Sequence, residues 1–253
     1  MNATRNNKPI PILMYHSIAL PPHDEVMRSI HVKPNSFATQ MWILKNLGYK
    51  GLSMSDLMPY LTGEKIGKVA GITFDDGYQN NLSNAAKILQ KHNFTATTYA
   101  VSNAIGGDNF WDRKVGIPPN TIMTKNELRN WVALGLEIGC HTAAHPDLTL
   151  LGAEQIRAEL TQSKSCLETI LDQPVTQFCY PYGKYDEQTK MLVRESGFET
   201  ATTMNRGRVS TNEDLLELPR IPITYHTLPH LFILKLLSGY EESRRANHAS
   251  DAQ

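Results

Sequence analysis

The chain has 253 residues, 41% of them hydrophobic, which is enough for one α/β domain with a large buried core. Lys plus Arg and Asp plus Glu number 25 each, so the overall charge argues against a protein that binds nucleic acid through a strongly basic surface. No apolar run is long enough to span a bilayer. The three cysteines, Cys140, Cys166 and Cys179, form no CxxC pair, so we expect reduced thiols.

Short apolar runs alternate with longer amphipathic segments along the chain, which is the pattern of βα units. Strands are predicted at residues 10–15, 69–74, 95–101, 136–139, 176–180, 200–204 and 218–223, with a short one near 51–53. Helices are predicted at residues 36–47, 79–92, 124–134, 153–171 and 186–196, and the apolar segment 231–237 is expected to cover the barrel as a further helix. These units predict a single α/β domain, a distorted or incomplete (β/α) barrel of about seven parallel strands.

The domain is expected to span residues 8–240, followed by a polar, disordered tail at residues 241–253. Two long loops, residues 20–34 and 102–123, interrupt the alternation and are rich in Pro, Gly and Asn. Because long loops after strands build the substrate site of a barrel, we expect both loops to lie near that site.

Two adjacent carboxylates, Asp75 and Asp76, follow the predicted strand 69–74 and precede Gly77. Neighbouring residues on a strand point in different directions, so the two carboxylates can hold different roles. Gly77 can adopt the backbone conformations that a sharp exit from a strand requires. The structural alternative is an Asp that caps the next helix beside a solvated neighbour.

His141 and His145 lie four residues apart, directly after the predicted strand 136–139. This spacing allows both imidazoles to face one metal ion, and Pro146 favours a shaped turn over a regular helix. With one Asp they would make a three-ligand site with open positions for water and substrate, and the other Asp would be free to move a proton, as in a hydrolase. The alternative is a capping histidine beside a surface histidine, and Cys140 is expected to pack in the core.

A third cluster, residues 178–183, places Phe-Cys-Tyr-Pro-Tyr-Gly at the end of another predicted strand. Pro181 and Gly183 predict a tight turn, so the backbone amide near Tyr182 is a candidate to face a developing oxyanion. The Tyr182 ring is a candidate to stack on a sugar. The alternative is an ordinary strand-to-helix turn with a packing tyrosine.

These segments occur in a fixed order at βα-sized spacings: TFDDG at 73–77, HTAAHP at 141–146 and YPYG at 180–183. The ordered set resembles the successive motifs of the polysaccharide deacetylases, carbohydrate esterase family four. LMYHSI at 13–18 and LPRI at 218–221 resemble the branch that contains poly-N-acetylglucosamine deacetylases. The resemblance implies a metal-dependent N-deacetylase, with its catalytic domain on a distorted (β/α) barrel.

The resemblance also assigns roles to the residues that match its motifs. Asp75 matches the general base, and Asp76, His141 and His145 match the metal ligands. It implies a metal that lowers the pKa of water and polarises the acetamide carbonyl, a proton taken by Asp75, and an oxyanion held by the Tyr182 amide. Zn²⁺ fits these ligands, although Co²⁺, Ni²⁺ or Fe²⁺ would also bind. The expected partner is an acetylated amino-sugar glycan, and the oligomeric state is not indicated.

Two positions depart from the family pattern. Where many members carry an arginine that orients the catalytic Asp, this chain has Cys179, and a thiol cannot replace a guanidinium. We hypothesise that Arg220 reaches the same carboxylate from a later strand, the alternative being a salt bridge at the barrel rim. The late histidine that commonly protonates the leaving amine has no well-matched motif, so His226 and, by its position after the first strand, His16 are both candidates. The alternative is that Asp75 serves both proton transfers.

Substrate contacts are expected from Tyr182, Pro181, Trp111 and His16, with Trp111 either stacking on a pyranose ring or anchoring its own loop. Two rival functions stay open at this point. One is a metal-dependent amidohydrolase for a small non-glycan amide, and the other is a catalytically inactive glycan-binding barrel. The polar N-terminus shows no export signal, so we expect a cytoplasmic location, with a possible association with a membrane glycan-synthesis pathway.

Overall fold

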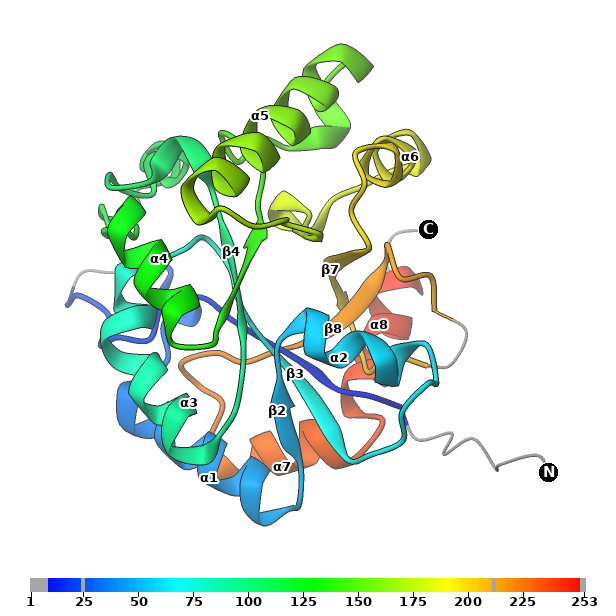
Figure 1. Ribbon diagram of the computed structural model, residues 1–253. Helices are drawn as coiled ribbons and strands as arrows, with labels where there is room; N and C mark the ends of the chain where they lie inside the picture. Colours follow the sequence, from blue (N-terminus) through cyan, green and yellow to red (C-terminus); the bar gives the residue numbers. More distant parts are fainter. Residues whose placement is uncertain (1–8, 24–25, 211–212, 251–253) are drawn as a thin grey trace.

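Eight parallel strands form the centre of the protein, which the computed structural model describes over residues 9–23, 26–210 and 213–250 (Figure 1). The strands are β1 (Ile12–Tyr15), β2 (Lys50–Leu52), β3 (Val69–Phe74), β4 (Thr97–Ala100), β5 (Glu137–Cys140), β6 (Gln177–Cys179), β7 (Thr200–Arg206) and β8 (Leu218–Pro222). Seven of them close into a barrel in the order β1-β8-β7-β6-β5-β4-β3, because β3 pairs again with β1, and β2 pairs with β3 as an extra strand. The predicted single-domain (β/α) barrel of about seven parallel strands is confirmed.

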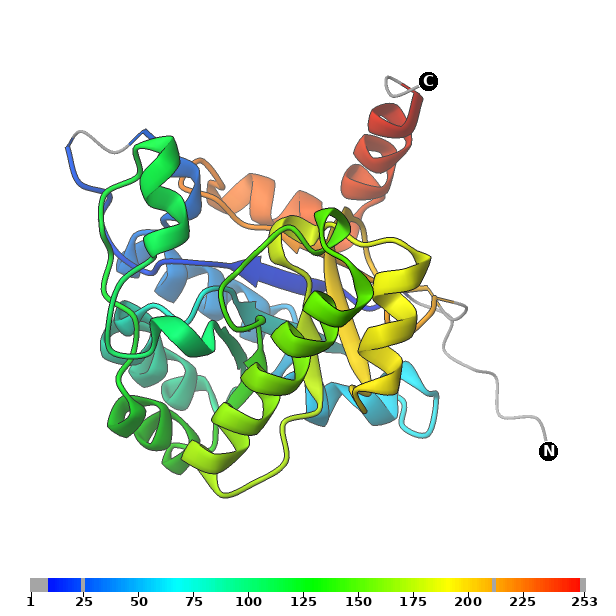
Figure 2. The ribbon, with the colours of Figure 1, turned by 90° about the horizontal axis from the view of Figure 1, so that it is seen from above.

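Helices cover the outside of this barrel (Figures 1 and 2). They are α1 (Pro34–Asn46), α2 (Met54–Leu61), α3 (Ala86–His92), α4 (Lys125–Ala133), α5 (Ala153–Leu171), α6 (Glu187–Glu195), α7 (Pro229–Leu237) and α8 (Tyr240–Ser250). The helix predicted at 79–92 begins as a π-helical segment, Asn81–Ala85, and continues as α3. Helix α2 was not predicted, because it is short and contains Pro59. None of the described helices combines the length and hydrophobicity that crossing a membrane requires.

The end of the chain differs from the prediction. Residues 241–250 belong to α8, so the expectation of disorder from residue 241 is wrong for that part, and residues 251–253 lie outside the described residues. Glu241 is fully buried, accepts a hydrogen bond of 2.6 Å from Arg206 Nε and pairs with the buried Lys235. A buried carboxylate needs such partners. The polar composition of the segment gave no indication of them.

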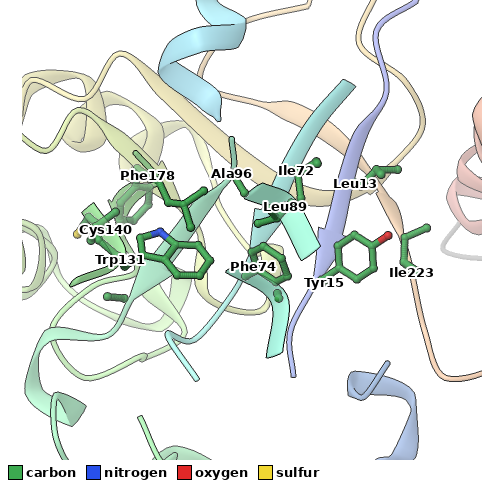
Figure 3. Close-up of a cluster of buried hydrophobic side chains, with 14 of the residues drawn as sticks. Leu13, Tyr15, Ile72, Phe74, Leu89, Ala96, Trp131, Cys140, Phe178 and Ile223 are labelled. Atoms are coloured by element: carbon green, nitrogen blue, oxygen red, sulfur yellow. The ribbon is translucent and has the colours of Figure 1, made fainter. Parts of the chain in front are cut away.

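The largest apolar cluster lies between the strands and the helices (Figure 3). Phe74, the last residue of β3, meets Trp131 of α4 edge to face with ring centroids 5.9 Å apart, and Phe37 of α1 lies 5.7 Å away. Trp131 Nε1 is itself held by a hydrogen bond of 2.8 Å to the Glu137 carbonyl. This packing fixes the strand end directly before Asp75.

Strand pairing brings the candidate site residues to one end of the barrel. Because the ends of β1 and β3 are in register, His16 and Asp75 leave the barrel side by side. Arg220 lies on β8, the other neighbour of β1. His141 follows β5 and Tyr182 follows β6, and these two strands also pair. The candidate residues therefore gather where the carboxyl ends of parallel strands meet, as expected for a barrel enzyme.

Candidate active site

The two adjacent carboxylates at the end of β3 are both buried, and they face different partners. Asp75 turns toward Arg220, whereas Asp76 turns toward His141 and His145. Asp76 has a positive φ of 75°, which redirects the chain between the two side chains. The two side chains therefore lie in different environments, and the different roles expected of them stay predictions.

Arg220 holds Asp75 through two parallel hydrogen bonds, of 2.6 Å from Nη1 to Oδ1 and 2.8 Å from Nη2 to Oδ2. The guanidinium is fixed in turn by hydrogen bonds to the Thr203 carbonyl at 2.9 Å, to Thr73 Oγ1 at 3.1 Å and to Cys179 Sγ at 3.3 Å. A bidentate, charge-assisted pair is among the strongest side-chain contacts. Arg220 thus reaches the carboxylate from a later strand as hypothesised, and Cys179 supports the arginine.

The charge of Arg220 decides the protonation state of Asp75. Burial alone would raise the pKa of this carboxyl, but the charge and the hydrogen bonds of Arg220 outweigh it, so the pKa of Asp75 lies well below its usual value. The carboxylate is therefore anionic over the whole physiological range of pH. The carboxylate can therefore accept a proton during a reaction, but the protonated form is not the resting state.

Asp76, His141 and His145 converge on one point. Asp76 Oδ1 lies 3.6 Å from the Nε2 atom of each histidine, and ligand atoms of the three residues lie within 4.8 Å of one another. The other nitrogen of His141, Nδ1, is hydrogen-bonded to the Cys179 carbonyl at 2.8 Å. Such a bond fixes the tautomer of a metal-binding histidine and leaves Nε2 free to coordinate.

The protonation states at this point fit a divalent metal. Burial raises the pKa of Asp76 to about 7, an effect that His141 reduces and Asp75 increases. Burial and the neighbouring His141 hold the pKa of His145 well below its usual value, so that its imidazole is neutral. A buried carboxylate that lacks a full cationic partner, beside a neutral imidazole, suits a cation. Zinc, cobalt, nickel or ferrous iron would accept such nitrogen and oxygen ligands.

A second group, Asp75, His141 and Cys179, also has ligand atoms within 4.8 Å of one another. It fits a metal less well, because Asp75 is already paired with Arg220 and because burial raises the pKa of the Cys179 thiol. Cys140 takes no part in either group, since its Sγ lies 2.9 Å from Ser163 Oγ in the core, as predicted.

Backbone strain concentrates at the site. Among the described non-glycine residues, six have a positive φ: Asp76, Asn93, Thr142, His145, Asp172 and Tyr182. Asn93 and Asp172 end helices, where this conformation is common. The other four belong to the three segments that carry the chemistry. Such strain persists where the surrounding structure enforces it, often at a functional site.

The turn that carries the two histidines is held by a residue that the sequence did not single out. Glu159 on α5 accepts hydrogen bonds from the backbone amides of Ala143 and Ala144, at 2.8 and 2.9 Å. Thr142 Oγ1 accepts a further one from the His145 amide at 3.0 Å. Glu159 lies on a regular amphipathic helix, so only knowledge of the packing of α5 against this turn could have identified it.

Two aromatic rings flank His145. Trp111 stacks on its imidazole with ring centroids 4.8 Å apart, and Tyr182 meets it edge-on at 4.6 Å. Tyr182 is 45% exposed, whereas the preceding Pro181 is buried. A Cβ on the following residue, Gly183, would lie 2.4 Å from the Met204 amide nitrogen, so only glycine fits this turn. The roles of Trp111, Tyr182 and Pro181 toward a substrate stay predictions.

Two histidines are candidates for the general acid that protonates the leaving amine, and of these His16 lies at the site. Its Nε2 atom is 3.8 Å from Asp75 Oδ2. Burial lowers the pKa of His16, and the carboxylates of Asp75 and Asp112 only partly offset this. His226 is exposed, and the ring contact described for it is with Tyr225 at 5.2 Å. Asp112 was not singled out, although its neighbour Trp111 was.

Comparison with known proteins identifies the family of the chain, and the matching region includes the three segments that form the site. The family model for polysaccharide deacetylases matches residues 62–201, more than half of the chain. The chain belongs to the polysaccharide deacetylase family. The resemblance read from the three motifs is confirmed, and with it the prediction of a hydrolase that acts on non-peptide C–N bonds.

Individual relatives are similar over most of this chain. The polysaccharide deacetylase candidate YxkH of Bacillus subtilis (strain 168) is 28% identical over 217 residues, which cover 85% of this chain and 71% of the relative. Poly-beta-1,6-N-acetyl-D-glucosamine N-deacetylase of Staphylococcus aureus (strain MRSA252) is 24% identical over 226 residues, 85% of this chain and 75% of the relative. The solved structure of Streptococcus pyogenes deacetylase PplD in complex with acetate has a TM-score of 0.79 and 27% identity, and the match covers 91% of this chain and 99% of that one.

The two carboxylates should affect stability with opposite signs in metal-free protein. Between pH 3.8, the usual pKa of an Asp, and about 7, the pKa of Asp76 in the folded protein, the folded state keeps a proton that the unfolded chain releases. The ionisable Asp76 therefore lowers the free energy of unfolding as pH rises through this range. Asp76→Asn is therefore expected to be more stable than wild type at pH 8, by up to about 4 kcal/mol, and similar to it at pH 4. Urea unfolding in the presence of a chelator measures this.

Asp75→Asn is the matched control. In wild type, the lowered pKa of Asp75 contributes stability that is fully present above pH 3.8, the usual pKa of an Asp, and is lost as pH falls below it. Removing this charge leaves Arg220 buried and unpaired, which costs about 3–5 kcal/mol at pH 8. Equal losses of stability in both variants at pH 8 would contradict the different states assigned to the two carboxylates.

Proposed function

We propose that this polysaccharide deacetylase is a metal-dependent enzyme that removes N-acetyl groups from an amino-sugar polysaccharide, oligosaccharide or glycan precursor. One observation carries the proposal. Two adjacent carboxylates face different partners, Asp75 the guanidinium of Arg220 and Asp76 the imidazoles of His141 and His145. Metal-assisted hydrolysis of an amide needs both a proton acceptor and a separate set of ligands.

The residues of this chain then act in sequence on the acetamide. Asp76, His141 and His145 would hold a divalent metal, which would supply Lewis acidity to lower the pKa of a water and to polarise the carbonyl. Asp75 accepts the proton of the attacking water as its oxygen bonds to the carbonyl carbon. The backbone amide of Tyr182 donates a hydrogen bond to the oxyanion. Breakage of the C–N bond releases acetate and the amine of the sugar.

The leaving amine needs a proton, and His16 is the better placed donor. Its Nε2 atom lies 3.8 Å from Asp75 Oδ2, so a small movement lets the two groups exchange a proton. Because Arg220 disfavours protonated Asp75, the proton passes readily to the imidazole, which burial keeps neutral beforehand. His16 then donates it to the nitrogen. His226 is the weaker candidate because it is exposed and lies beside Tyr225.

The surroundings of the site suit a sugar. Trp111 and Tyr182 flank His145, and aromatic faces of this kind stack on pyranose rings. The Staphylococcus aureus relative is named for poly-beta-1,6-N-acetyl-D-glucosamine. This similarity supports a polymer or oligomer of N-acetylglucosamine as the substrate class. An inactive glycan-binding barrel is disfavoured, because Arg220 supplies to Asp75 the contact that Cys179 cannot make.

Acetate release from β-1,6-linked N-acetylglucosamine oligomers tests the proposed function. Turnover is expected with metal-loaded protein, is lost on chelation and returns with Zn²⁺ or Co²⁺. Asp75→Asn should bind the oligomers and the metal without turnover. An acetylated small non-glycan amide serves as the comparison substrate. Turnover of that amide alone, or no acetate from metal-loaded protein, would contradict the proposal.

Arg220→Lys tests whether the arginine positions the base. A lysine cannot make the bidentate contact, so kcat is expected to fall about 100-fold while KM and metal content stay close to wild type. Arg206→Lys is the control, because Arg206 pairs with Glu241 rather than with the site. Near-normal turnover by Arg220→Lys would leave the arginine with a structural role only.

His16→Gln and His226→Gln distinguish the two candidate acids. Loss of a general acid typically costs 10²-fold or more in kcat, and we expect about this effect for His16→Gln with metal content unchanged. His226→Gln should retain turnover within about twofold, since its side chain is exposed. The opposite order of effects would assign the proton transfer to His226.

A further inference from the structure

One outer face of the barrel has a charge distribution that the deacetylase site does not explain. Helix α1 packs against both α3 and α7 on this face (Figure 1). The three segments that contain these helices, residues 26–55, 77–107 and 218–240, carry no Asp or Glu. The exposed lysines of the same segments are Lys33, Lys45, Lys50, Lys87 and Lys91. The balanced net charge of the chain therefore conceals a one-sided distribution.

Large apolar side chains are exposed on the same face. On α7, Phe232 and Leu236 fill the core, yet Leu234 and Leu237 on the opposite side of the helix are 44% and 48% exposed. Ile233 is exposed beside them, and Trp42 on α1 is 58% exposed. A helix that covers a barrel with one side needs polar residues on the other. The outward apolar side of α7 thus has no partner among the described residues.

One end of this face, formed by the loops after β1 and β8, reaches the rim of the active site. Arg28 and Lys33 lie over the Tyr225 ring, 5.0 and 4.9 Å from its centroid. The exposed Leu228 follows shortly after. These residues come from the loops after β1, which His16 follows directly, and after β8, which contains Arg220. The face is therefore continuous with the end of the barrel that holds the chemistry.

We propose that this α1–α7 face docks on the surface of an anionic lipid bilayer. The face consists of Trp42, Tyr225, Leu228, Ile233, Leu234 and Leu237, with Arg28, Lys33, Lys45, Lys87 and Lys91 around them. Its apolar side chains enter the boundary between headgroups and acyl chains, and its cations attract anionic headgroups. Aromatic rings beside Lys and Arg are typical of that boundary. Docking would hold the active site near a glycan attached to the same membrane.

Other occupants explain only part of the composition. A second copy of this chain would bring exposed lysines against lysines, and α1, α3 and α7 carry no carboxylate to pair with them, which is repulsive. A nucleic acid would use the cations but leaves the exposed leucines and isoleucine unexplained. The bilayer accounts for both features. The inference concerns where the enzyme acts, and it does not depend on the chemistry proposed for the site.

Sedimentation of the full chain with vesicles tests the proposal. Binding to phosphatidylcholine vesicles that contain phosphatidylglycerol is expected to be about tenfold stronger than to phosphatidylcholine alone, and to weaken with added salt. The double variant Leu234→Gln/Leu237→Gln should bind at least about tenfold more weakly. Met191→Gln is the control, because Met191 is also 48% exposed but lies on α6, which packs against α5.

Two further measurements locate the contact. Lipids brominated in the acyl chain should quench a tryptophan fluorescence component that Trp42→Phe removes. Lys45→Glu/Lys91→Glu should lose the preference for anionic vesicles, while acetate release from a soluble oligomer stays unchanged in all these variants. Absent vesicle binding, or binding unaffected by the leucine or lysine variants, would overturn the proposal. Self-association abolished by the leucine variant without vesicle binding would also overturn it, and would assign the face to a second copy.

Discussion

The ion pair between Arg220 and Asp75 is the contact on which the rest of the site depends. It joins β8 to β3 across the intervening strand β1, at the end of the barrel where the chemistry gathers. Both side chains are almost fully buried, so the loss of either leaves the other charge unpaired in the protein interior. The same contact therefore supports barrel closure and keeps Asp75 anionic. It also gives Asp75 and Asp76 different surroundings, because the arginine bonds only the first.

The site relies on strained turns that the surrounding structure enforces. Asp76, Thr142, His145 and Tyr182 all have positive φ, and each lies just beyond a barrel strand. Glu159 holds the histidine turn through two backbone amides, and Phe74 is fixed by aromatic packing just before the carboxylates. Rigid strands thus position short turns, and the turns position the side chains. Contacts around the ligand residues of this kind are what orients the ligands in metal sites generally.

Much of this arrangement was predictable from the sequence, for a physical reason. The alternation of apolar runs and amphipathic segments fixes a parallel barrel, and parallel strands present their carboxyl ends on one rim. Asp75, Asp76, His141 and His145 each follow a strand, so their meeting followed from the fold. Arg220 could be linked to Asp75 for the same reason. Glu159 could not, because nothing in an amphipathic helix indicates which turn one of its carboxylates will hold. Helix α8 was missed because the partners of Glu241 come from other elements.

The central claim is that Asp76, His141 and His145 bind the metal while Asp75 stays outside its coordination sphere. X-ray absorption spectroscopy at the zinc edge of the loaded protein tests this most directly. Nitrogen and oxygen ligands at about 2.0–2.1 Å are predicted, with two imidazoles and no sulfur. A zinc–sulfur distance of about 2.3 Å would show that Cys179 binds the metal. That result would favour the alternative group of Asp75, His141 and Cys179 and contradict the separate roles of the two carboxylates.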